Sequence, residues 1–267
     1  MKQLIGLLLI CLLGCTEKEI IIPPLEIPTT GRTVLVEDLT GVRCPNCPSG
    51  NARLESIQSI YGKNVVVVSV HGEFLTDPLP ESTVDLRSPS AIMLEEFWRP
   101  FLGKPSAVID RKSYDGFFSM VPNPLQDQWQ PIIERELQEP HLADLVVQAT
   151  LDNEGIEIST GIIAIEELPD IKIHVFLVEN EIIDPQEDVD KLILDYEHNH
   201  VLRIIATPIE GERITDDIEI GGVTNYTTTI GTSELEAEWN RNNMEIVCFI
   251  TEEEGGVIQV QTASITQ

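Results

Sequence analysis

Two short apolar runs near the start of the chain frame a segment of helix length. Residues 33–39, TVLVEDL, and residues 64–70, NVVVVSV, are rich in β-branched and apolar side chains, which is typical of buried strands. The segment between them, residues 49–62, ends in a glycine and carries apolar side chains at helical spacing, namely Ala52, Leu54, Ile57, Ile60 and Tyr61. The order strand, helix, strand predicts a βαβ unit with parallel strands.

A pair of cysteines, in the motif Cys44-Pro-Asn-Cys47, stands where this helix is expected to begin. Pro48 suits an early helical position because its missing amide hydrogen is not needed there. The partial positive charge and free amides of a helix N-terminus stabilise a thiolate, and Arg43 adds to that stabilisation. We therefore expect Cys44, at the exposed end, to be the attacking thiolate and Cys47, one turn further, to be the resolving partner.

The same pair of cysteines is also compatible with half of a zinc site or with a structural bridge. A closed zinc site needs four ligands, usually from two paired motifs, whereas the sequence has one such motif and His71, the nearest histidine, stands alone. His198 and His200 share one face of an expected strand, but no third ligand can be placed beside them. We therefore expect no metal, and a static bridge between Cys44 and Cys47 stays open.

The first fifteen residues, MKQLIGLLLICLLGC, indicate export from the cytoplasm. One lysine precedes an apolar run from Leu4 to Leu13, which is too short to span a bilayer as a permanent helix and is typical of a signal peptide. The run ends in Leu-Leu-Gly-Cys, which resembles the bacterial lipobox. That resemblance implies that Cys15 becomes the first residue of the mature chain and carries acyl chains, such as palmitate, that hold it on a membrane.

Residues 16–31 are expected to form a tether behind this anchor. Three prolines, Pro23, Pro24 and Pro28, keep the segment extended and disfavour a helix. The mature protein is then extracytoplasmic, where disulfides persist.

The formal net charge of −28, from 45 acidic and 17 basic residues, restricts the possible partners. Charge of this sign and size repels phosphate backbones, so we expect no nucleic acid among them. We interpret the acidity as the solvated surface of an exported protein.

From Ala143 onward the sequence pattern changes to alternating strands. Residues 145–180 alternate apolar and polar side chains and break at Asp152–Gly155 and at Pro169-Asp170, and further strand-like runs follow at 200–206, 226–230, 245–251 and 256–263. Several short strands with almost no helix predict an antiparallel β-sandwich. Cys248 falls inside one of these runs and is expected to be a buried, small apolar residue.

Residues 102–110, LGKPSAVID, place Pro105 directly ahead of a strand-like run. This resembles the cis-proline loop that faces the CxxC motif in thioredoxin-like folds, and tertiary structure can hold the cis bond because it costs only about 0.5–1 kcal/mol. The resemblance implies that Pro105 lies opposite the cysteines and that Lys104, the residue before it, contacts the backbone of a substrate peptide.

The same resemblance implies a buried acid that accepts and returns protons. Asp38, six residues before Cys44, stands in that place, and Glu37 is the alternative if the strand register differs by one.

The whole chain resembles the 28-kilodalton outer membrane protein family of Bacteroidetes, which are lipid-anchored proteins with a thioredoxin-like domain. The matching residues are Glu37-Asp-Leu-Thr-Gly41, Cys44-Pro-Asn-Cys-Pro48, Gly103-Lys-Pro105 and His198-Asn-His-Val-Leu-Arg203. The expected fold class is α/β plus all-β: a signal peptide over residues 1–15 that ends at lipidated Cys15, a tether over 16–31, a thioredoxin-like domain over 32–140 and a β-sandwich domain over 141–267. The resemblance implies an outer-membrane location on the periplasmic or the cell-surface face.

Two functions are compatible with these features. The first is thiol–disulfide exchange on exported proteins, in which Cys44 and Cys47 react, Pro105 and Asp38 assist, and the two basic residues Lys104 and Arg43 contact the substrate; no cofactor is needed. The partners would then be the membrane, through the lipid anchor, and protein or peptide thiols. The alternative is a non-catalytic surface binding or adhesion lipoprotein in which the cysteines form a structural disulfide.

Overall fold

The computed structural model describes residues 31–114, 121–214 and 217–266. The expected signal peptide, the expected lipidation site Cys15 and nearly all of the expected tether lie outside the described residues. Within the described ranges, no helix combines the length and the apolar character needed to cross a membrane.

The first part of the described chain contains the predicted strand–helix–strand unit, followed by two further helices and two further strands. These elements are β1 (Val34–Leu39), α1 (Cys47–Tyr61), the 3₁₀ turn η1 (Gly62–Asn64), β2 (Val65–Val70), α2 (Pro89–Phe97), β3 (Ser106–Ile109), β4 (Pro122–Asn123) and α3 (Gln126–Glu136). The strand order is β2-β1-β3-β4, with β1 parallel to β2 and antiparallel to β3, and with β3 antiparallel to β4.

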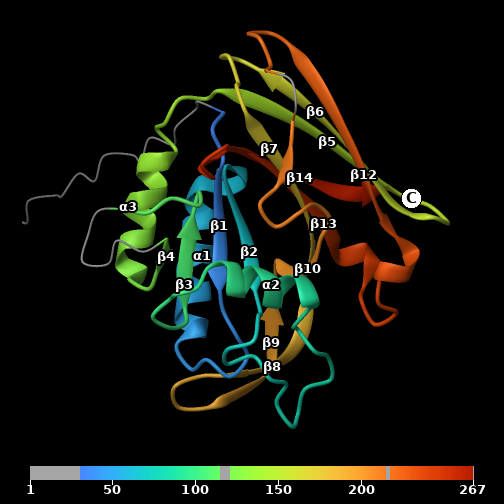
Figure 1. Ribbon diagram of the computed structural model, residues 1–267. Coiled ribbons are helices and arrows are strands. Elements are labelled where there is room, and N and C mark those ends of the chain that lie inside the picture. The colour runs from blue at the N-terminus through green and yellow to red at the C-terminus, as the bar shows by residue number, and fades with distance from the viewer. Residues whose placement is uncertain (1–30, 115–120, 215–216, 267) are drawn as a thin grey trace, which may run out of the picture.

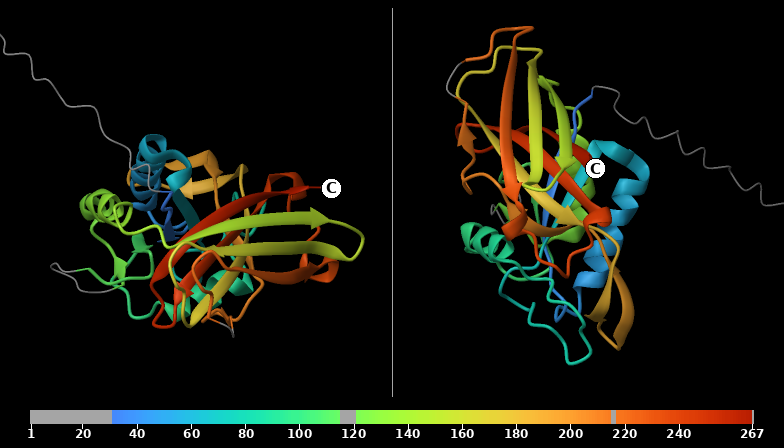
Figure 2. Two further views of the ribbon diagram at one scale, coloured as in Figure 1. Left: turned by 90° about the horizontal axis from the view of Figure 1, so that it is seen from above. Right: turned by 90° about the vertical axis from the view of Figure 1, so that its right-hand side faces the viewer.

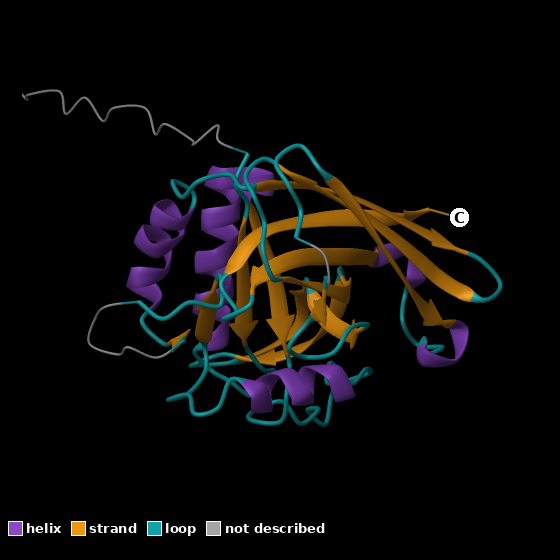
Figure 3. Cartoon of the chain, turned by 45° about the horizontal axis from the view of Figure 1, so that its top comes forward, coloured by secondary structure: helices purple, strands orange, loops and turns teal. Residues whose placement is uncertain are grey.

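Alternating residues of β1 face two different hydrophobic clusters. Val34 and Val36 pack with α1 and α3, whereas Leu35 and Leu39 pack with α2 and with apolar residues from β7 and β13. The side chains therefore place α1 and α3 together on one face of the sheet and α2 on the other, as Figures 1 and 3 show.

The second part of the described chain consists of strands and two short 3₁₀ turns. They are β5 (Ala143–Leu151), β6 (Gly155–Ala164), β7 (Ile171–Glu179), β8 (Ile182–Glu187), β9 (Leu192–His198), β10 (Val201–Ile205), β11 (Glu212–Arg213), β12 (Val223–Gly231), η2 (Thr232–Glu234), η3 (Arg241–Asn243), β13 (Met244–Glu252) and β14 (Val257–Thr266).

Strands from both parts form one large mixed sheet instead of two separate ones. Its order is β12-β6-β5-β14-β13-β7-β10-β2-β1-β3-β4, with β11 added beside β7. The two parts meet where β10 pairs with β2 in parallel, at Val201 and Ser69. The long β5, β6 and β12 lie side by side in Figure 2, and apolar side chains of β5 and β6 pack with those of β7 and β13 in one cluster.

The expected fold class, α/β followed by an antiparallel β-sandwich, therefore holds only in part. The fold is mostly β with three α-helices among the described residues. A parallel pairing of β2 with β10 joins the two parts, and within the second part β14 pairs with β5 in parallel and not antiparallel. Alternation along the sequence reveals strands and not their distant partners, so these pairings were not foreseeable.

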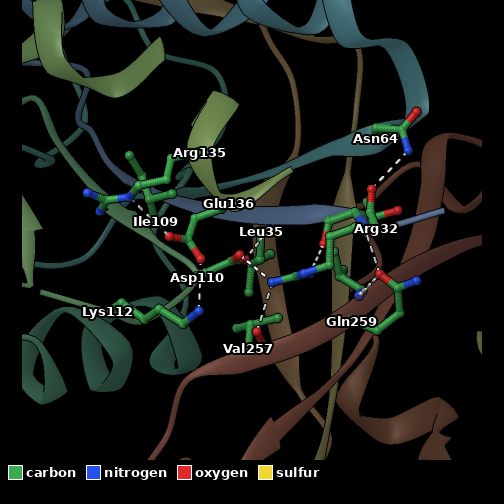
Figure 4. Close-up of polar contacts among 12 residues, drawn as sticks. Arg32, Leu35, Asn64, Ile109, Asp110, Lys112, Arg135, Glu136, Val257 and Gln259 are labelled. Carbon is green, nitrogen blue, oxygen red and sulfur yellow. Dashed lines mark hydrogen bonds and ion pairs between the residues drawn. The ribbon is translucent and has the colours of Figure 1, made fainter. Parts of the chain in front are cut away.

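A buried ionic network also links the start of β1 to the second part (Figure 4). The Arg32 guanidinium lies 2.5 Å from Asp110 Oδ2 and donates to the carbonyl oxygen of Val257 at 2.9 Å. Asp110 Oδ1 in turn accepts from the backbone amide of Leu35. The ion pair of Arg32 and Asp110 thus connects the start of β1 and the residue after β3 to the start of β14.

Candidate functional site

A disulfide joins Cys44 and Cys47 at the start of α1, which begins at Cys47. The turn between β1 and α1 is closed by two backbone hydrogen bonds, from the Cys44 amide to the Gly41 carbonyl (3.0 Å) and from the Cys47 amide to the Cys44 carbonyl (3.1 Å). Pro48 occupies the first turn of the helix, as its sequence position predicts.

The peptide bond between Lys104 and Pro105 is cis, and Pro105 lies against the first turns of α1. The contact is made at Gly50, where an added Cβ would lie 2.9 Å from both Cβ and Cγ of Pro105. Because Gly50 follows Cys47 by three residues, the structure brings the proline loop and the cysteine motif together. The part that Pro105 plays in a reaction stays a prediction.

Both cysteines are buried, whereas Cys44 was expected at an exposed position. The exposed fraction is 1% for Cys44 and 0% for Cys47. One reason is the loop after β2: the Leu75 carbonyl accepts from the Arg43 amide at 3.0 Å, and it also lies 2.3 Å from where a Cβ on Gly41 would be. That close approach requires glycine at position 41.

The second reason for the burial is the hairpin formed by β8 and β9, a separate two-stranded sheet beside the cysteine motif. The Gln186 Nε2 donates to the carbonyl oxygens of Gly41 (3.1 Å) and Cys44 (3.2 Å). The Glu187 amide donates to the Val42 carbonyl at 2.8 Å. The cysteine turn is therefore held between two segments that are remote in the sequence.

Asp38 lies at the base of this site, at the end of β1. Burial raises the pKa of the Asp38 carboxyl to about 7, against the opposing effect of the Lys104 ammonium. With the Asn51 amide oriented to satisfy its neighbours, its nitrogen donates to Asp38 Oδ2 (3.1 Å) and to the Cys47 carbonyl (3.2 Å). Its oxygen accepts from the Tyr196 hydroxyl at 3.0 Å. A chain of polar groups thus connects Asp38, the first residue of α1 and the β8–β9 hairpin.

The structure also distinguishes Asp38 from the alternative acid, Glu37. The Glu37 carboxylate is fully buried and forms an ion pair with Arg111 at 2.6 Å. Side chains of neighbouring strand residues point to opposite faces of the sheet, so one of the two acids faces α1 and the other does not. Asp38 is the one that contacts Asn51 of α1.

The Lys104 side chain is buried and points into the protein. Its ammonium lies 2.5 Å from Glu95 Oε2 and donates to the Thr40 carbonyl at 2.7 Å. Burial lowers the pKa of Lys104, while Glu95 counteracts that shift. Only the backbone of Lys104 is left to contact a substrate peptide, and that role stays a prediction.

Arg43 links the two segments that cover the cysteine turn. Its guanidinium donates to the carbonyl oxygens of Asp77 (2.8 Å) and Pro78 (2.7 Å), and it lies 3.6 Å from Glu187 Oε1. The expected substrate contact of Arg43 stays a prediction, because these bonds already occupy part of its guanidinium.

Sequence reasoning missed Asn51, Glu95 and the residues of the β8–β9 hairpin. A polar Asn51 four residues after Cys47 was a usable signal, since it falls on the same face of the helix. The hairpin was not recognised because Pro185 interrupts its first strand, and a proline lowers the strand propensity of such a run.

The remaining candidate residues lie away from the disulfide or have structural partners. Cys248 is a free thiol, fully buried as expected, and burial raises its pKa to about 12. His198 is buried beside His71, with ring centroids 5.6 Å apart, and burial lowers the pKa of His198 to about 4. In the part of the chain that the structure describes, no three His, Cys, Asp or Glu residues gather as metal ligands would.

Among the solved structures with a similar fold are two bacterial proteins of low sequence identity. HBP35 of Porphyromonas gingivalis has a TM-score of 0.66 at 14% sequence identity, over 89% of this chain and 76% of that chain. A protein from Agrobacterium tumefaciens has a TM-score of 0.50 at 12% identity, over 87% of this chain and 94% of that chain. At these identities the likeness concerns the fold alone. No curated protein matches the chain.

A comparison with protein families identifies the chain itself. Residues 95–267 match the family described as Outer membrane protein Omp28, and this range covers more than half of the chain. It includes Pro105 and the β8–β9 hairpin but not the cysteine motif. The family confirms the resemblance seen in the sequence and the outer-membrane location. The chain belongs to the Omp28 family of outer membrane proteins.

Proposed function

We propose that this outer membrane protein is held by lipid on Cys15 and exchanges thiols and disulfides with exported proteins. The observation that carries the proposal is the disulfide at the start of α1, together with the cis-proline before β3 that packs against Gly50 in the first turn of the same helix. No cofactor is required, because the cysteine sulfurs themselves accept and donate the electrons.

The arrangement of the first part supports a thioredoxin-like assignment for residues 32–140. It has the strand order β2-β1-β3-β4, a parallel β1–β2 pair joined by α1, and helices on both faces. The disulfide lies at the N-terminus of the helix that follows the central strand β1, where the helix dipole stabilises a thiolate. The β-rich segment 141–267 is then an elaboration that carries the β8–β9 hairpin.

The reaction proceeds through a mixed disulfide. A substrate thiolate attacks the Cys44 sulfur, the Cys44–Cys47 bond breaks, and the Cys47 sulfur leaves as a thiolate that takes up a proton. A second substrate thiolate attacks the mixed disulfide and releases Cys44 as a thiolate. The substrate is oxidised by two electrons, and the cysteine pair is reduced. Asp38, with a pKa of about 7, is able to hold or release a proton near neutral pH.

Exposed apolar side chains next to the site support a peptide substrate. Phe74 is 45% exposed, and its ring lies 6.4 Å from that of Phe101; Leu102 is 57% exposed. Phe74 directly precedes the Leu75 carbonyl that covers the cysteine turn, and Leu102 lies two residues before Lys104. Such side chains offer contacts for an unfolded segment of an exported protein.

The test is a cysteine trap in the full-length protein in its own cell envelope. Cys47→Ser removes the resolving thiol, so Cys44 should accumulate mixed disulfides that appear on non-reducing gels and are identified by mass spectrometry. Cys44→Ser/Cys47→Ser and Cys248→Ser are the controls: the first should show no adducts, and the second should leave the wild-type behaviour unchanged. Absence of adducts with Cys47→Ser would overturn the proposal.

Burial of both sulfurs favours the second candidate, a structural disulfide in a binding or adhesion protein. The reduction potential distinguishes the two. A structural disulfide in an exported protein has a potential below about −300 mV, whereas an exchanging pair lies above that value.

The lipid anchor is tested separately: Cys15→Ala should abolish labelling by an alkyne analogue of palmitate and release the protein from the membrane fraction.

A further inference from the structure

The strand β2 is fully paired along one side and almost unpaired along the other. β1 pairs with it from Val65 to Val70, whereas β10 meets it only at Ser69, opposite Val201. His200, just before Val201, has a φ of 59°, so the chain turns away there instead of continuing along β2. Among the described residues, no strand pairs with this edge of β2 before Ser69.

Two adjoining cavities run along the unpaired edge. One, of about 480 Å³, lies between α1 and the end of the β8–β9 hairpin, and the other, of about 370 Å³, lies between β2 and the strands β13 and β14. They share the lining residues Gln58, Val67 and His200, so they adjoin each other along β2, and we call the two together the β2 groove. Both volumes lie within the usual range of ligand sites, about 300–1,000 Å³.

The backbone of Val67 faces into the β2 groove. The Ser69 amide donates to the His200 carbonyl at 2.8 Å, so the polar groups of Ser69 point toward β10. Backbone N–H and C=O groups of alternate strand residues point to the same side, which places those of Val67 on the same edge. Val67 is buried, and no strand among the described residues pairs with it there. A buried unpaired edge is a template for an added strand.

The charges that line the groove favour an added strand with basic side chains. Its lining has one ammonium group, Lys63, and five carboxyl groups, which are Asp38, Glu55, Asp144, Glu197 and Glu245. Asp38 contributes a buried oxygen, Oδ1, that has no hydrogen-bond partner. Buried polar oxygens normally have a donor, and an ammonium or guanidinium group supplies one together with the complementary charge.

We propose that the β2 groove binds an extended peptide segment carrying Lys or Arg. The segment adds to β2 as a strand and occupies the edge of β2 before Ser69, which β10 leaves unpaired. This site goes beyond the thiol–disulfide exchange proposed above and does not depend on it. The backbone of the peptide pairs with Val67, and a basic side chain reaches Asp38 between α1 and the hairpin. The groove is also separate from the Pro105 loop, which packs against a different residue set of α1, at Gly50.

The test uses the full mature protein and a fluorescein-labelled peptide of alternating lysine and valine, with binding measured by fluorescence polarisation. A glutamate–valine peptide of the same length should not bind. Two further lysine–valine peptides carry N-methyl groups on alternate amides, one on the odd and the other on the even positions. Strand addition predicts that one set weakens binding by about ten-fold or more, because it removes backbone hydrogen bonds, while the other set has little effect. Equal effects of the two sets would overturn strand addition.

Variants of the groove test the charge requirement. Glu55→Gln/Glu197→Gln should weaken binding of the lysine–valine peptide about ten-fold and reduce its dependence on salt. Glu166→Gln/Glu167→Gln, which changes two exposed acids outside the groove, is the matched control and should bind as the wild type does. Equal affinity in both double variants would overturn the charge argument.

Hydrogen exchange gives a direct measurement on the backbone. The Val67 amide should exchange faster than those of its neighbours Val66 and Val68 in the free protein and should become protected when the lysine–valine peptide binds. A Val67 amide that is as protected as its neighbours before binding would overturn the proposal. Peptide binding by Cys44→Ser/Cys47→Ser should equal that of the wild type, so failure of the redox function would leave this result unaffected.

Discussion

The side-chain amide of Gln186 donates to the carbonyl oxygen of Cys44 at 3.2 Å, so the β8–β9 hairpin is bonded directly to the cysteine turn. The same amide also reaches the Gly41 carbonyl at 3.1 Å. Access of a thiolate to the Cys44 sulfur therefore depends on a hairpin that is encoded 142 residues later in the chain.

Gln186→Ala should make the disulfide more accessible to reductants. The variant removes two hydrogen bonds that hold the hairpin on the turn, at about 1 kcal/mol each, so the segment opens more often. We expect faster reduction by tris(2-carboxyethyl)phosphine, followed by thiol alkylation over time. Gln148→Ala, on the exposed side of β5, is the control and should react at the wild-type rate. An unchanged rate in Gln186→Ala would show that other contacts govern access.

Gly50→Ala should destabilise the protein through a clash with Pro105. The added methyl group would lie 2.9 Å from two carbons of a rigid ring, and such overpacking costs about 1–3 kcal/mol. Gly103→Ala is the matched control, because nothing lies within 4 Å of its added Cβ. Urea unfolding should show a lower midpoint for the first variant only. Equal midpoints would mean that the proline loop shifts without cost.

Asp38→Asn should change the pH dependence of stability. Burial raises the pKa of Asp38 from 3.8 to about 7, so between these values the folded chain binds a proton that the unfolded chain does not. The contribution of Asp38 to stability is therefore favourable at low pH and is lost as the pH rises through 7. The free energy of unfolding of the variant, measured with urea and relative to that of the wild type, should rise by up to about 4 kcal/mol between pH 4 and pH 8. A constant difference across this range would contradict the raised pKa.

Lys104→Met should be strongly destabilising because it removes the buried ammonium 2.5 Å from the Glu95 carboxylate and leaves it only the half-exposed Arg99, at 3.7 Å. Breaking such a pair costs about 3–5 kcal/mol, whereas replacing both partners together costs much less. Lys104→Met/Glu95→Gln should therefore recover part of the loss in thermal unfolding. Arg213→Gln breaks an exposed pair with Glu253 and should change stability by less than about 1 kcal/mol. A double variant as unstable as Lys104→Met would contradict the pairing.

The local structure around the cysteines was predictable because its signals are local. Apolar runs, helical spacing and Pro48 predict β1, α1 and β2 from neighbouring residues alone, and the structure has all three. Pro105 before a strand-like run predicted a proline loop, and its bond to Lys104 is cis. The expectation that this loop lies opposite the cysteines came from the resemblance to thioredoxin-like folds, since no sequence pattern encodes that contact.

The parts that escaped prediction depend on contacts between distant residues. The burial of Cys44 results from Leu75 and Gln186, which approach it only after the chain has folded. The pairing of Lys104 with Glu95 turns an apparent surface lysine inward. The junction of β2 with β10 rests on one residue pair, which alternation in either segment cannot reveal.

One hydrophobic cluster described above contains Leu35 and Val68 from the first part of the chain together with Phe176 and Phe249 from the second. A fragment that ends near residue 140 would therefore leave half of that cluster open to water. Until Phe176 and Phe249 have followed in the chain, the apolar face of the first part lacks these partners, and exposed apolar surface of this kind is prone to aggregation. Heating should accordingly melt both parts in one transition.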